Sequence, residues 1–519
     1  MTTDRAALAR TLDLPYHAEV TADAALFELL PVETASRLAI LPLTTSGDTL
    51  TVAVSDPLDL TLERRLASIT GRRIALAVAE PEAIAAELSR VETSRRVLDR
   101  VSAGFKPELV REAGGREDVI DLESLADQSG MVQLANSILM AALQRQASDV
   151  HIEVGADRVE LKYRVDGVLY PATDPIDASH HSALVSRIKV MADLDIAERR
   201  VPQDGRFRLR IEGRDVDFRV SVLPTQWGED VVIRILDKSH LSRLGQRMRL
   251  DDLGLAPGIL SALRQSAREP HGLVLMTGPT GSGKTTTLYG AISELATGAE
   301  KVITIEDPIE YELEGVVQIA VNEKTGMTFA SGLRAILRHD PDRIMVGEIR
   351  DLETATIAVQ AALTGHLVLA SVHANSAFDV VSRFAHWGID LHDVVAALRG
   401  VFAQRLIRQL CPDCATSAPA PTGPLGNTVA LPADPPLWRA AVGCSRCFGS
   451  GYLGRRAIVE HLAITPDVQD LMIARAPAAR LREAALAGGM VPLRDAALAE
   501  AWAGRSSLAE VDRVTFAAS

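Results

Sequence analysis

The run GPTGSGKTT constrains this chain more than any other segment, because it fits the phosphate-binding pattern G-x-x-x-x-G-K-[ST]. Its glycines let the backbone turn tightly, so that successive N–H groups point into one hollow of phosphate size. Lys284 is placed to reach the outer phosphates of a nucleoside triphosphate such as ATP, and Thr285 to coordinate Mg²⁺. The apolar run at 272–277 indicates a buried parallel strand, and a helix-forming run follows the loop. The predicted phosphate-binding residues are Gly278, Pro279, Thr280, Gly281, Ser282, Gly283, Lys284, Thr285 and Thr286.

Length and composition are typical of a globular enzyme with several domains. The chain has 519 residues, of which 47% are hydrophobic, which suggests about three domains with sizeable cores. No apolar run approaches the roughly 18 residues that span a bilayer, and residues 1–15 lack the pattern of a signal peptide, so we expect a cytoplasmic protein. A net charge of −13 and 4% aromatic residues disfavour a protein that coats nucleic acid, and no direct nucleic-acid partner is expected.

Shifts in composition divide the chain into three folded regions and two links. Residues 1–95 are predicted to form an N-terminal α+β domain, 96–125 a charged linker, and 126–237 a small middle α+β domain. A second polar link covers 238–250. In the C-terminal domain, 251–519, strands and helices alternate around the phosphate loop, which predicts a doubly wound α/β core.

All four cysteines lie in two C-x-x-C pairs within 411–447, and they predict a zinc-binding subdomain. Four thiolates form a closed tetrahedral zinc site that leaves no position for catalysis, so the predicted zinc is structural. Disulfides or a redox centre are the alternative. The segment 415–437 is rich in Pro and Ala, which favours an irregular loop closed at its base by Zn²⁺. The predicted ligands are Cys411, Cys414, Cys444 and Cys447.

Three further apolar runs of the C-terminal domain end in ionisable residues, and parallel sheets place active groups at such strand ends. Glu348 follows the run 344–346 and is predicted to hold Mg²⁺ or to orient the attacking water; the alternative is a structural ion pair with Arg350. A second acidic cluster, which could also be a solvated loop, consists of Glu306, Asp307 and Glu310.

Histidine and arginine side chains near these strand ends are further candidates. His366 and His373 each lie at a strand end, where a lone histidine is more often a hydrogen-bonding residue than a phosphate sensor. Arg334 and Arg338 are one helical turn apart, so both can share a helix face that points towards the nucleotide. Two solvated arginines on a helix surface fit the same spacing equally well.

The middle domain contains a predicted hairpin of strands 206–211 and 214–220 around a two-residue turn. In that register Arg206 faces Arg219, and like charges directly opposite are destabilising unless an anion or carboxylate lies between them. We expect that anion to be a phosphate of ATP, with a carboxylate such as Asp204 as the alternative. The other predicted pairs are Phe207 with Phe218, Leu209 with Val216, Arg208 with Asp217, and Arg210 with Asp215.

Together these segments resemble the type II secretion traffic ATPase family. The resemblance is dense over residues 130–415. One segment departs from the family pattern: at 371–375 the chain has SVHAN, where the family commonly has a Thr-Leu-His-Thr-Asn run. It rests on GPTGSGKTTT, EDPIEY, RAILRHDPDRIMVGEIRDLETA, TGHLVLASVHANSA and QRLIRQLCPDC, with ASDVHIE and AERRVPQDGR upstream.

The resemblance implies a ring-shaped homo-hexamer with a RecA-like P-loop ATPase core and a PAS-like middle domain. ATP is expected to bind between the middle and C-terminal domains, with Glu348 as the Walker B glutamate. Hydrolysis is expected to drive pilin-like subunits into a filament during protein secretion. Through residues 1–95 the chain is expected to bind an inner-membrane secretion platform protein and its cytoplasmic adaptor domain, which recruits it peripherally to the inner membrane. Alternatives are a type IV pilus extension ATPase and, with less support, a nucleic-acid translocase.

Overall fold

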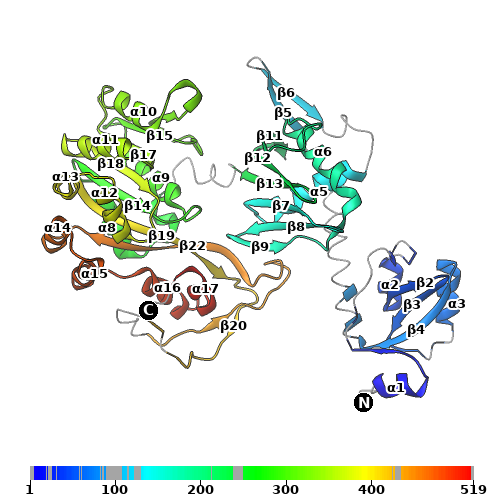
Figure 1. The fold of residues 1–519 in the computed structure, drawn as a ribbon. Coiled ribbons are helices and arrows are strands. Elements are labelled where there is room, and N and C mark those ends of the chain that lie inside the picture. Colours follow the sequence, from blue (N-terminus) through cyan, green and yellow to red (C-terminus); the bar gives the residue numbers. More distant parts are fainter. Residues whose placement is uncertain are drawn as a thin grey trace. The chain divides into compact units, whose positions relative to one another are not determined.

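The computed structural model of the chain divides into two compact units, Met1–Leu236 and Asp237–Ser519 (Figure 1). The predicted link at 238–250 lies outside the described residues except for 249 and 250. Described are residues 5–88 without 19, 21–25, 28, 31, 58, 60, 82 and 85–86, residues 108–121 without 114–115, residues 130–237 without 212, and residues 249–515 without 424 and 427–433.

The N-terminal domain, within residues 5–88, contains a four-stranded sheet in the order β1-β4-β3-β2. Strands β2 and β3 form a hairpin around Gly47, and β3 and β4 are parallel because helix α3 lies between them in the chain. Leu62 and Leu66 lie one helical turn apart and are buried against the sheet. The elements are α1 (Arg5–Thr11), β1 (Tyr16–His17), α2 (Val32–Leu38), β2 (Ile40–Ser46), β3 (Thr49–Val54), α3 (Leu62–Thr70) and β4 (Arg73–Ala79).

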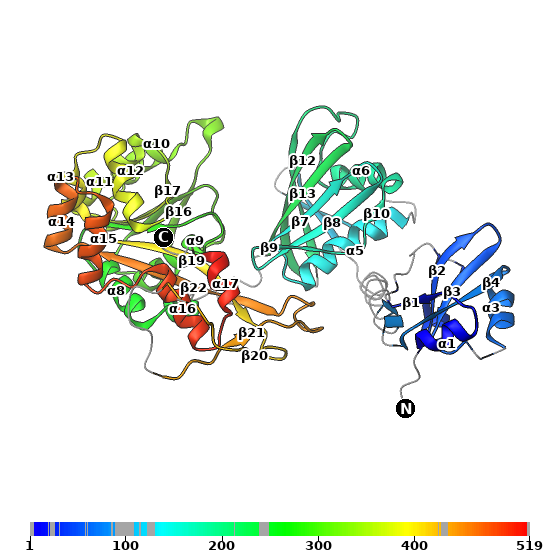
Figure 2. The ribbon, with the colours of Figure 1, turned by 60° about the horizontal axis from the view of Figure 1, so that its bottom comes forward.

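The middle domain, within residues 108–237, is built on a nine-stranded sheet whose main path runs β10-β8-β7-β13-β12-β11-β5-β6, with β9 beside β8. Helices α5 and α6 share one hydrophobic core with the alternating buried residues of the strands (Figures 1 and 2). The elements are β5 (Glu108–Ala113), β6 (Arg116–Asp121), α5 (Gly130–Gln144), β7 (Asp149–Val154), β8 (Arg158–Val165), β9 (Val168–Pro171), β10 (Ile176–Asp177), α6 (His181–Met191), β11 (Gln203–Ile211), β12 (Arg214–Thr225) and β13 (Gly228–Asp237).

The segment 96–125, predicted as a linker, contains the hairpin β5–β6. Strand β5 pairs antiparallel with β11, so the hairpin extends the sheet of the middle domain. The physical reason is that the outer edge of β11 offers unpaired N–H and C=O groups, which an added strand satisfies. The sheet of the middle domain therefore begins earlier in the chain than composition indicates.

The β11–β12 hairpin confirms the predicted register. Phe207 faces Phe218 with stacked rings 4.7 Å apart between centroids. On the opposite face, Arg208 and Arg210 form ion pairs with Asp217 and Asp215, each with a 2.8 Å contact. Period-2 alternation therefore specifies this pairing from the sequence.

The C-terminal domain, within residues 249–515, contains a seven-stranded sheet in the order β16-β15-β17-β18-β14-β19-β22. All neighbours are parallel except β19 and β22. The strands are β14 (Gly272–Thr277), β15 (Val302–Glu306), β16 (Val316–Ala320), β17 (Arg343–Ile349), β18 (Leu367–Val372), β19 (Leu398–Leu410) and β22 (Tyr452–Ala463).

Helices cover both faces of this sheet, which confirms the predicted α/β class. One core lies between the sheet and α10 to α15, and a second lies between the opposite face and α8 and α9. The short pair β20 (Thr416–Ser417) and β21 (Arg439–Ala440) belongs to the cysteine-containing segment. The helices are α8 (Pro257–Ala267), α9 (Lys284–Leu295), α10 (Phe329–Ile336), α11 (Leu352–Leu363), α12 (Ala377–His386), α13 (Leu391–Ala397), α14 (Pro466–Ile473), α15 (Ala478–Ala487), α16 (Leu493–Trp502) and α17 (Leu508–Val514).

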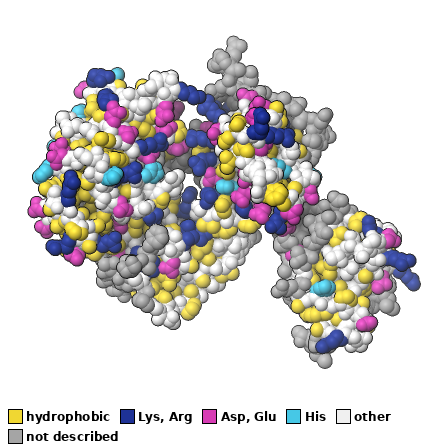
Figure 3. All heavy atoms as spheres, in the orientation of Figure 1, with side chains coloured by type: hydrophobic (Ala, Val, Ile, Leu, Met, Phe, Trp, Pro, Cys, Tyr) yellow, Lys and Arg dark blue, Asp and Glu magenta, His cyan; other side chains and the backbone are white. Residues whose placement is uncertain are grey.

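Charged side chains of both signs are intermixed on the faces of the middle and C-terminal domains seen in Figure 3. Arg264, for example, contacts both Asp251 and Glu294. Within the described ranges, every helix is too short or too polar to cross a membrane.

Candidate nucleotide and zinc sites

The phosphate loop connects β14 to α9 at the carboxyl edge of the parallel strands. Strand β14 spans Gly272–Thr277 and is fully buried, as the apolar run predicts. Gly278, Gly281 and Gly283 have φ angles of 142°, 76° and 83°, which side chains with a Cβ rarely adopt. The glycines of the motif are therefore required by the shape of the loop.

Lys284 is the first residue of α9, and its side chain folds back over the loop. Its Nζ atom donates hydrogen bonds to the carbonyl oxygens of Gly278 at 2.8 Å and Pro279 at 3.1 Å. Burial lowers the pKa of Lys284, and the negative charge of Glu348 opposes that shift. The hydroxyl of Ser282 is buried and has no partner among the described residues, whereas Thr285 is exposed on the first turn of the helix. Ammonium and backbone N–H groups donate hydrogen bonds to the oxygens of a triphosphate, and a hydroxyl oxygen such as that of Thr285 can coordinate Mg²⁺, so the loop fits both.

Glu348 lies in β17, at a point where the strand departs from regular pairing. The register between β17 and β18 shifts between Val346 and Ile349, and Ser371 donates a 2.6 Å hydrogen bond to the carbonyl of Gly347. A bulge of this kind re-aims side chains and is common beside active sites. It places the carboxylate of Glu348 where it interacts electrostatically with Lys284.

Two cationic or polar side chains hold the carboxylate of Glu348. His373 Nε2 lies 2.8 Å from Oε1, and Arg350 Nε donates to Oε2 at 2.6 Å. Arg350 also contacts Asp307 at 3.4 Å, and its bond to Glu348 raises the pKa of the guanidinium group. The predicted site residues Glu348, His373 and Asp307 thus form one cluster.

Glu306, the first residue of the predicted acidic cluster, is buried among hydrogen-bond donors and does not lie in a solvated loop. The side chain is only 2% exposed and accepts hydrogen bonds from Tyr289, from Thr304 at 2.5 Å and from Gln318 at 3.1 Å. Burial, and then the charge of Glu306, raise the pKa of Tyr289, which keeps its hydroxyl a donor. These donors occupy both carboxylate oxygens, so Glu306 connects β15 to α9. Glu310 lies beside this group, because its backbone N–H donates to the Tyr289 hydroxyl at 3.4 Å.

Arg338 lies beyond the end of the helix that carries Arg334. Helix α10 ends at Ile336, which leaves Arg338 in the following turn. Arg334 is exposed and bonded to Glu353 of α11. Arg334 therefore has the environment of a surface arginine.

Arg206 and Arg219 face each other on exposed positions of β11 and β12. Asp204 lies two residues along the same strand, but among the described residues no ion pair joins it to either arginine. Their neighbours Arg208 and Arg210 are paired with aspartates. Two cationic groups thus lie next to each other without a counter-ion in the described part of the hairpin.

The four cysteines form one cluster, in which the sulfur atoms all lie within 4.8 Å of one another. The Sγ atoms of Cys411 and Cys444 are 3.8 Å apart, as are those of Cys414 and Cys447. Four sulfurs at about 2.3 Å from a central zinc, in tetrahedral geometry, lie about 3.8 Å from one another. The cluster therefore fits Zn²⁺, and its sulfurs are too far apart for disulfide bonds.

The backbone and the charged residues of the two knuckles support the cluster. The N–H groups of Cys444 and Gly451 donate to Cys447 Sγ at 3.1 and 3.2 Å. Although burial acts in the opposite direction, these bonds help to lower the pKa of Cys447 to about 7, which favours the thiolate that binds metal. Asp413 and Arg446, one from each knuckle, form a 2.8 Å ion pair.

Several residues that brace the site were absent from the sequence predictions. Thr277, the last residue of β14, exchanges two hydrogen bonds with the backbone of Ala374, at 2.9 and 3.0 Å. Arg383 of α12 donates to the carbonyl of His373 at 2.8 Å. The third bracing residue is Tyr289, on the buried face of α9, which donates to Glu306. Their partners lie on other segments, 10 to 97 residues away in the chain, so periodicity and local spacing carried no signal for these contacts.

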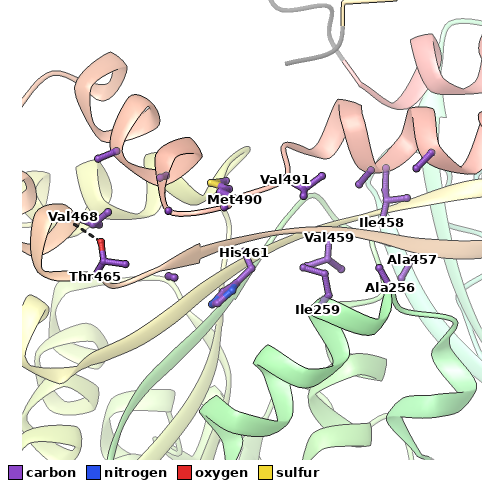
Figure 4. Close-up of a pocket in the computed structure, with 18 of the residues that line it drawn as sticks. Ala256, Ile259, Ala457, Ile458, Val459, His461, Thr465, Val468, Met490 and Val491 are labelled. Carbon is purple, nitrogen blue, oxygen red and sulfur yellow. Dashed lines mark hydrogen bonds between the residues drawn. The ribbon is translucent and has the colours of Figure 1, made fainter. Parts of the chain in front are cut away.

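A separate cavity of about 400 Å³ lies between β22, α8 and the helices α14 to α16 (Figure 4). It is lined mainly by apolar residues, and its polar lining residues are His461 on β22, Thr465 and Glu500. The ring of His461 stacks on Phe402 with 4.3 Å between centroids, and burial lowers its pKa to about 4. Residues 278–286 do not contribute to its lining.

Comparison with known proteins shows the family to which the chain belongs. Residues 124–513, well over half of the chain, match the family described as type II/IV secretion system protein. The chain belongs to this family. It is a secretion ATPase and hydrolyses ATP, which confirms the predicted resemblance and enzyme class. Residues 12–98 of this secretion ATPase match the MshEN domain.

This secretion ATPase is 42% identical to type II secretion system protein E of Pectobacterium carotovorum subsp. carotovorum over 494 residues, which covers 94% of this chain and 97% of the relative. It is 39% identical over 493 residues to the type IV pilus assembly ATPase PilB of Myxococcus xanthus, covering 94% and 86%. The solved structure of the ATPase DotB from Legionella pneumophila matches with a TM-score of 0.53 at 21% identity, covering 73% of this chain and 95% of that chain. The likeness to DotB supports the fold.

Proposed function

We propose that this secretion ATPase is the motor of a type II protein secretion system. It couples ATP hydrolysis to assembly of a pseudopilus and to export of folded proteins across the outer membrane. The observation that carries the proposal is the cluster at the strand ends, where Glu348 and His373 lie 2.8 Å apart and Glu348 interacts with Lys284 of the phosphate loop. The full-length likeness to a type II secretion protein E supports the choice of system.

In this proposal each residue of the cluster has a distinct role. The phosphate loop and Lys284 bind the phosphates of ATP, and Thr285 would hold Mg²⁺, which would supply positive charge to balance the charge that develops on the phosphates. Glu348 orients the attacking water and accepts its proton, because its carboxylate lies at the strand end beside Lys284. His373 and Arg350 orient Glu348 through their bonds to its two oxygens. Asp307 keeps Arg350 in place, while Glu306 and Glu310 hold the acidic loop against α9.

We further propose that Arg206 and Arg219 bind the phosphates of ATP, which couples nucleotide state to movement of the middle domain. Their facing charges leave a site for an anion on β11 and β12. An arginine contact that exists only with ATP stabilises the domain arrangement only in that state. Moving such an equilibrium almost completely takes about 5.5 kcal/mol of differential binding. Several charge-assisted hydrogen bonds can supply that energy. Arg334 and Arg338 are less favoured for this role, because Arg334 is engaged by Glu353.

Replacing Arg206 or Arg219 by Ala should lower ATP turnover by about tenfold and leave the Kd for ATP nearly unchanged. The reason is that each arginine contributes charge to the hydrolytic state, while the phosphate loop makes most of the contacts that hold the nucleotide. Steady-state ATPase assays and nucleotide titrations measure the two quantities. Arg210→Ala is the matched control, since Arg210 is on the same strand and already paired with Asp215. Unchanged turnover in both test variants would remove this role.

The assembly and partners belong to the same proposal. The chain acts as a homo-hexamer on the cytoplasmic side of the inner membrane, where residues 1–95 bind the adaptor domain of the secretion platform. The match of residues 12–98 to a domain separate from the ATPase region supports a distinct binding role for this segment. The four-cysteine cluster binds one structural Zn²⁺.

A type IV pilus extension motor is the second candidate, because the chain is 39% identical to PilB over nearly its whole length. The two candidates differ in what the cell loses when the motor stops. In the native organism, Glu348→Gln should abolish release of secreted proteins into the medium and leave surface pili intact. Loss of pili with normal secretion would instead assign the chain to pilus extension.

A further inference from the structure

Strand β19 runs beneath the phosphate loop and presents one polar side chain to it. Strands β14 and β19 are parallel, and the last residue of β14, Thr277, is opposite Ala403. The next residue of β19, Gln404, therefore lies beside Gly278, where the loop begins. Gln404 is only 1% exposed, although glutamine is a residue type that usually reaches solvent.

The amide of Gln404 spans the loop and the first turn of α9. Its Nε2 donates a 2.8 Å hydrogen bond to the carbonyl of Ser282, and its Oε1 accepts a 2.9 Å hydrogen bond from the hydroxyl of Thr287. A carbonyl oxygen can only accept, so the NH₂ end of the amide must face Ser282. The chemistry of the two partners therefore sets the orientation of the side chain, and glutamate could not make both bonds.

The backbone of the loop is packed closely against this residue. A Cβ atom at Gly283 would lie 2.9 Å from Gln404 Nε2, and one at Gly278 would collide with the carbonyl oxygen of Gln404. Two of the motif glycines thus have a second reason to lack a side chain, besides their positive φ angles. The loop rests on Gln404 through direct contact at both of its ends.

We propose that Gln404 is a positioning residue that keeps the phosphate loop in its phosphate-binding conformation. The carbonyl of Ser282 and the N–H of Gly283 belong to one planar trans peptide, so they point in opposite directions. By holding that carbonyl inward, Gln404 turns the N–H of Gly283 towards the phosphate side of the loop. Without the bond, this peptide can rotate and present its carbonyl oxygen to the phosphates, which repels them.

The test is to replace Gln404 by Met, which has a similar length and no hydrogen-bonding amide, and by Glu. We expect Gln404→Met to raise the KM for ATP and the Kd for ADP by about tenfold, with a smaller change in kcat. Gln404→Glu should raise the KM for ATP and the Kd for ADP further, because the carboxylate of glutamate has no N–H group to donate to the carbonyl of Ser282. Gln409→Met, on the same strand, is the matched control and should leave both constants unchanged. If Gln404 only stabilised the fold, its replacement would lower the unfolding temperature and the fraction of active protein. The KM for ATP and the Kd for ADP would then stay unchanged.

A second pair of variants decides the matter if Gln404→Met does not fold. Thr287→Val removes the hydroxyl that orients the amide, and Thr287→Ser retains it. The first should raise the KM for ATP by about threefold and the second should keep the normal value. Normal KM and Kd in the folded Gln404 variants, or equal KM values for Thr287→Val and Thr287→Ser, would overturn the proposal.

This inference rests on ATP binding at the phosphate loop, which Lys284→Ala tests separately. If Lys284→Ala leaves the Kd for ADP unchanged, the location of the nucleotide site is wrong. If Lys284→Ala weakens binding while the Gln404 variants bind normally, the nucleotide site stands and only the role of Gln404 fails.

Discussion

Replacing Glu348 by Gln is expected to lower ATP turnover by about 100-fold or more, while ATP still binds. The amide has nearly the same shape as the carboxylate and can still contact His373, but it cannot accept a proton from the attacking water. The phosphate loop is unchanged, so affinity for the nucleotide should remain close to normal. Turnover is measured by phosphate release at saturating ATP, and binding by titration of the purified variant.

The control for this experiment is Glu353→Gln. Glu353 is an exposed carboxylate in the same domain and bonds to Arg334 on the surface. The Glu353→Gln variant should keep normal ATP turnover, since exposed ion pairs contribute little to stability. Turnover of Glu348→Gln within about twofold of the unmodified protein would show that another group performs the proton transfer.

Replacing both Cys411 and Cys447 by Ser is expected to abolish zinc binding and to unfold residues 411–451 locally. Both thiols are buried, and metal binding contributes about 10 kcal/mol or more to the stability of sites of this kind. Among its described residues, the Pro- and Ala-rich segment between the knuckles has regular structure only in the short pair β20–β21, so hydrogen-bonded strands contribute little to its stability. Metal analysis and hydrogen exchange of the segment measure the two effects.

Asp413→Asn is the matched control for the zinc experiment. It breaks the exposed ion pair between the knuckles and leaves all four thiols in place. Zinc content should stay at one per chain, and exchange protection should change little, because such a pair contributes at most about 1 kcal/mol. A double-serine variant with full protection of residues 411–451 would show that the knuckles fold without metal.

Local patterns were sufficient wherever neighbouring residues in the chain decide the structure. Strand β14 has the bounds of the apolar run before the loop. The β11–β12 register followed from alternation around a short turn, because a shift by one residue would expose Phe207 and Phe218. The spacing of the cysteines likewise predicted one cluster, and the sulfur distances agree with it.

Sequence patterns did not predict the structure where contacts between distant segments determine it. The acidic cluster 306–310 looked uniform in sequence, yet its first member is buried under three donors and Asp307 is bonded to Arg350. The spacing of Arg334 and Arg338 suggested a shared helix face, but α10 ends between them. The linker at 96–125 contains a hairpin because the edge of β11 accepts it. The pairing of β5 with β11 and the contact of Asp307 with Arg350 both depend on partners far away in the chain.

The sequence by itself determined the phosphate loop, the α/β alternation around it, the hairpin register and the four-cysteine cluster, because each depends on residue types at short, regular spacing. Only the tertiary structure decided which ionisable residues meet. Glu348 joins His373 because β17 and β18 are adjacent in the sheet, although α11 separates them in the chain. Gln404 reaches the loop because β19 lies beside β14, more than a hundred residues later. Parallel sheets bring together strands that are remote in sequence, and the active groups lie at those junctions.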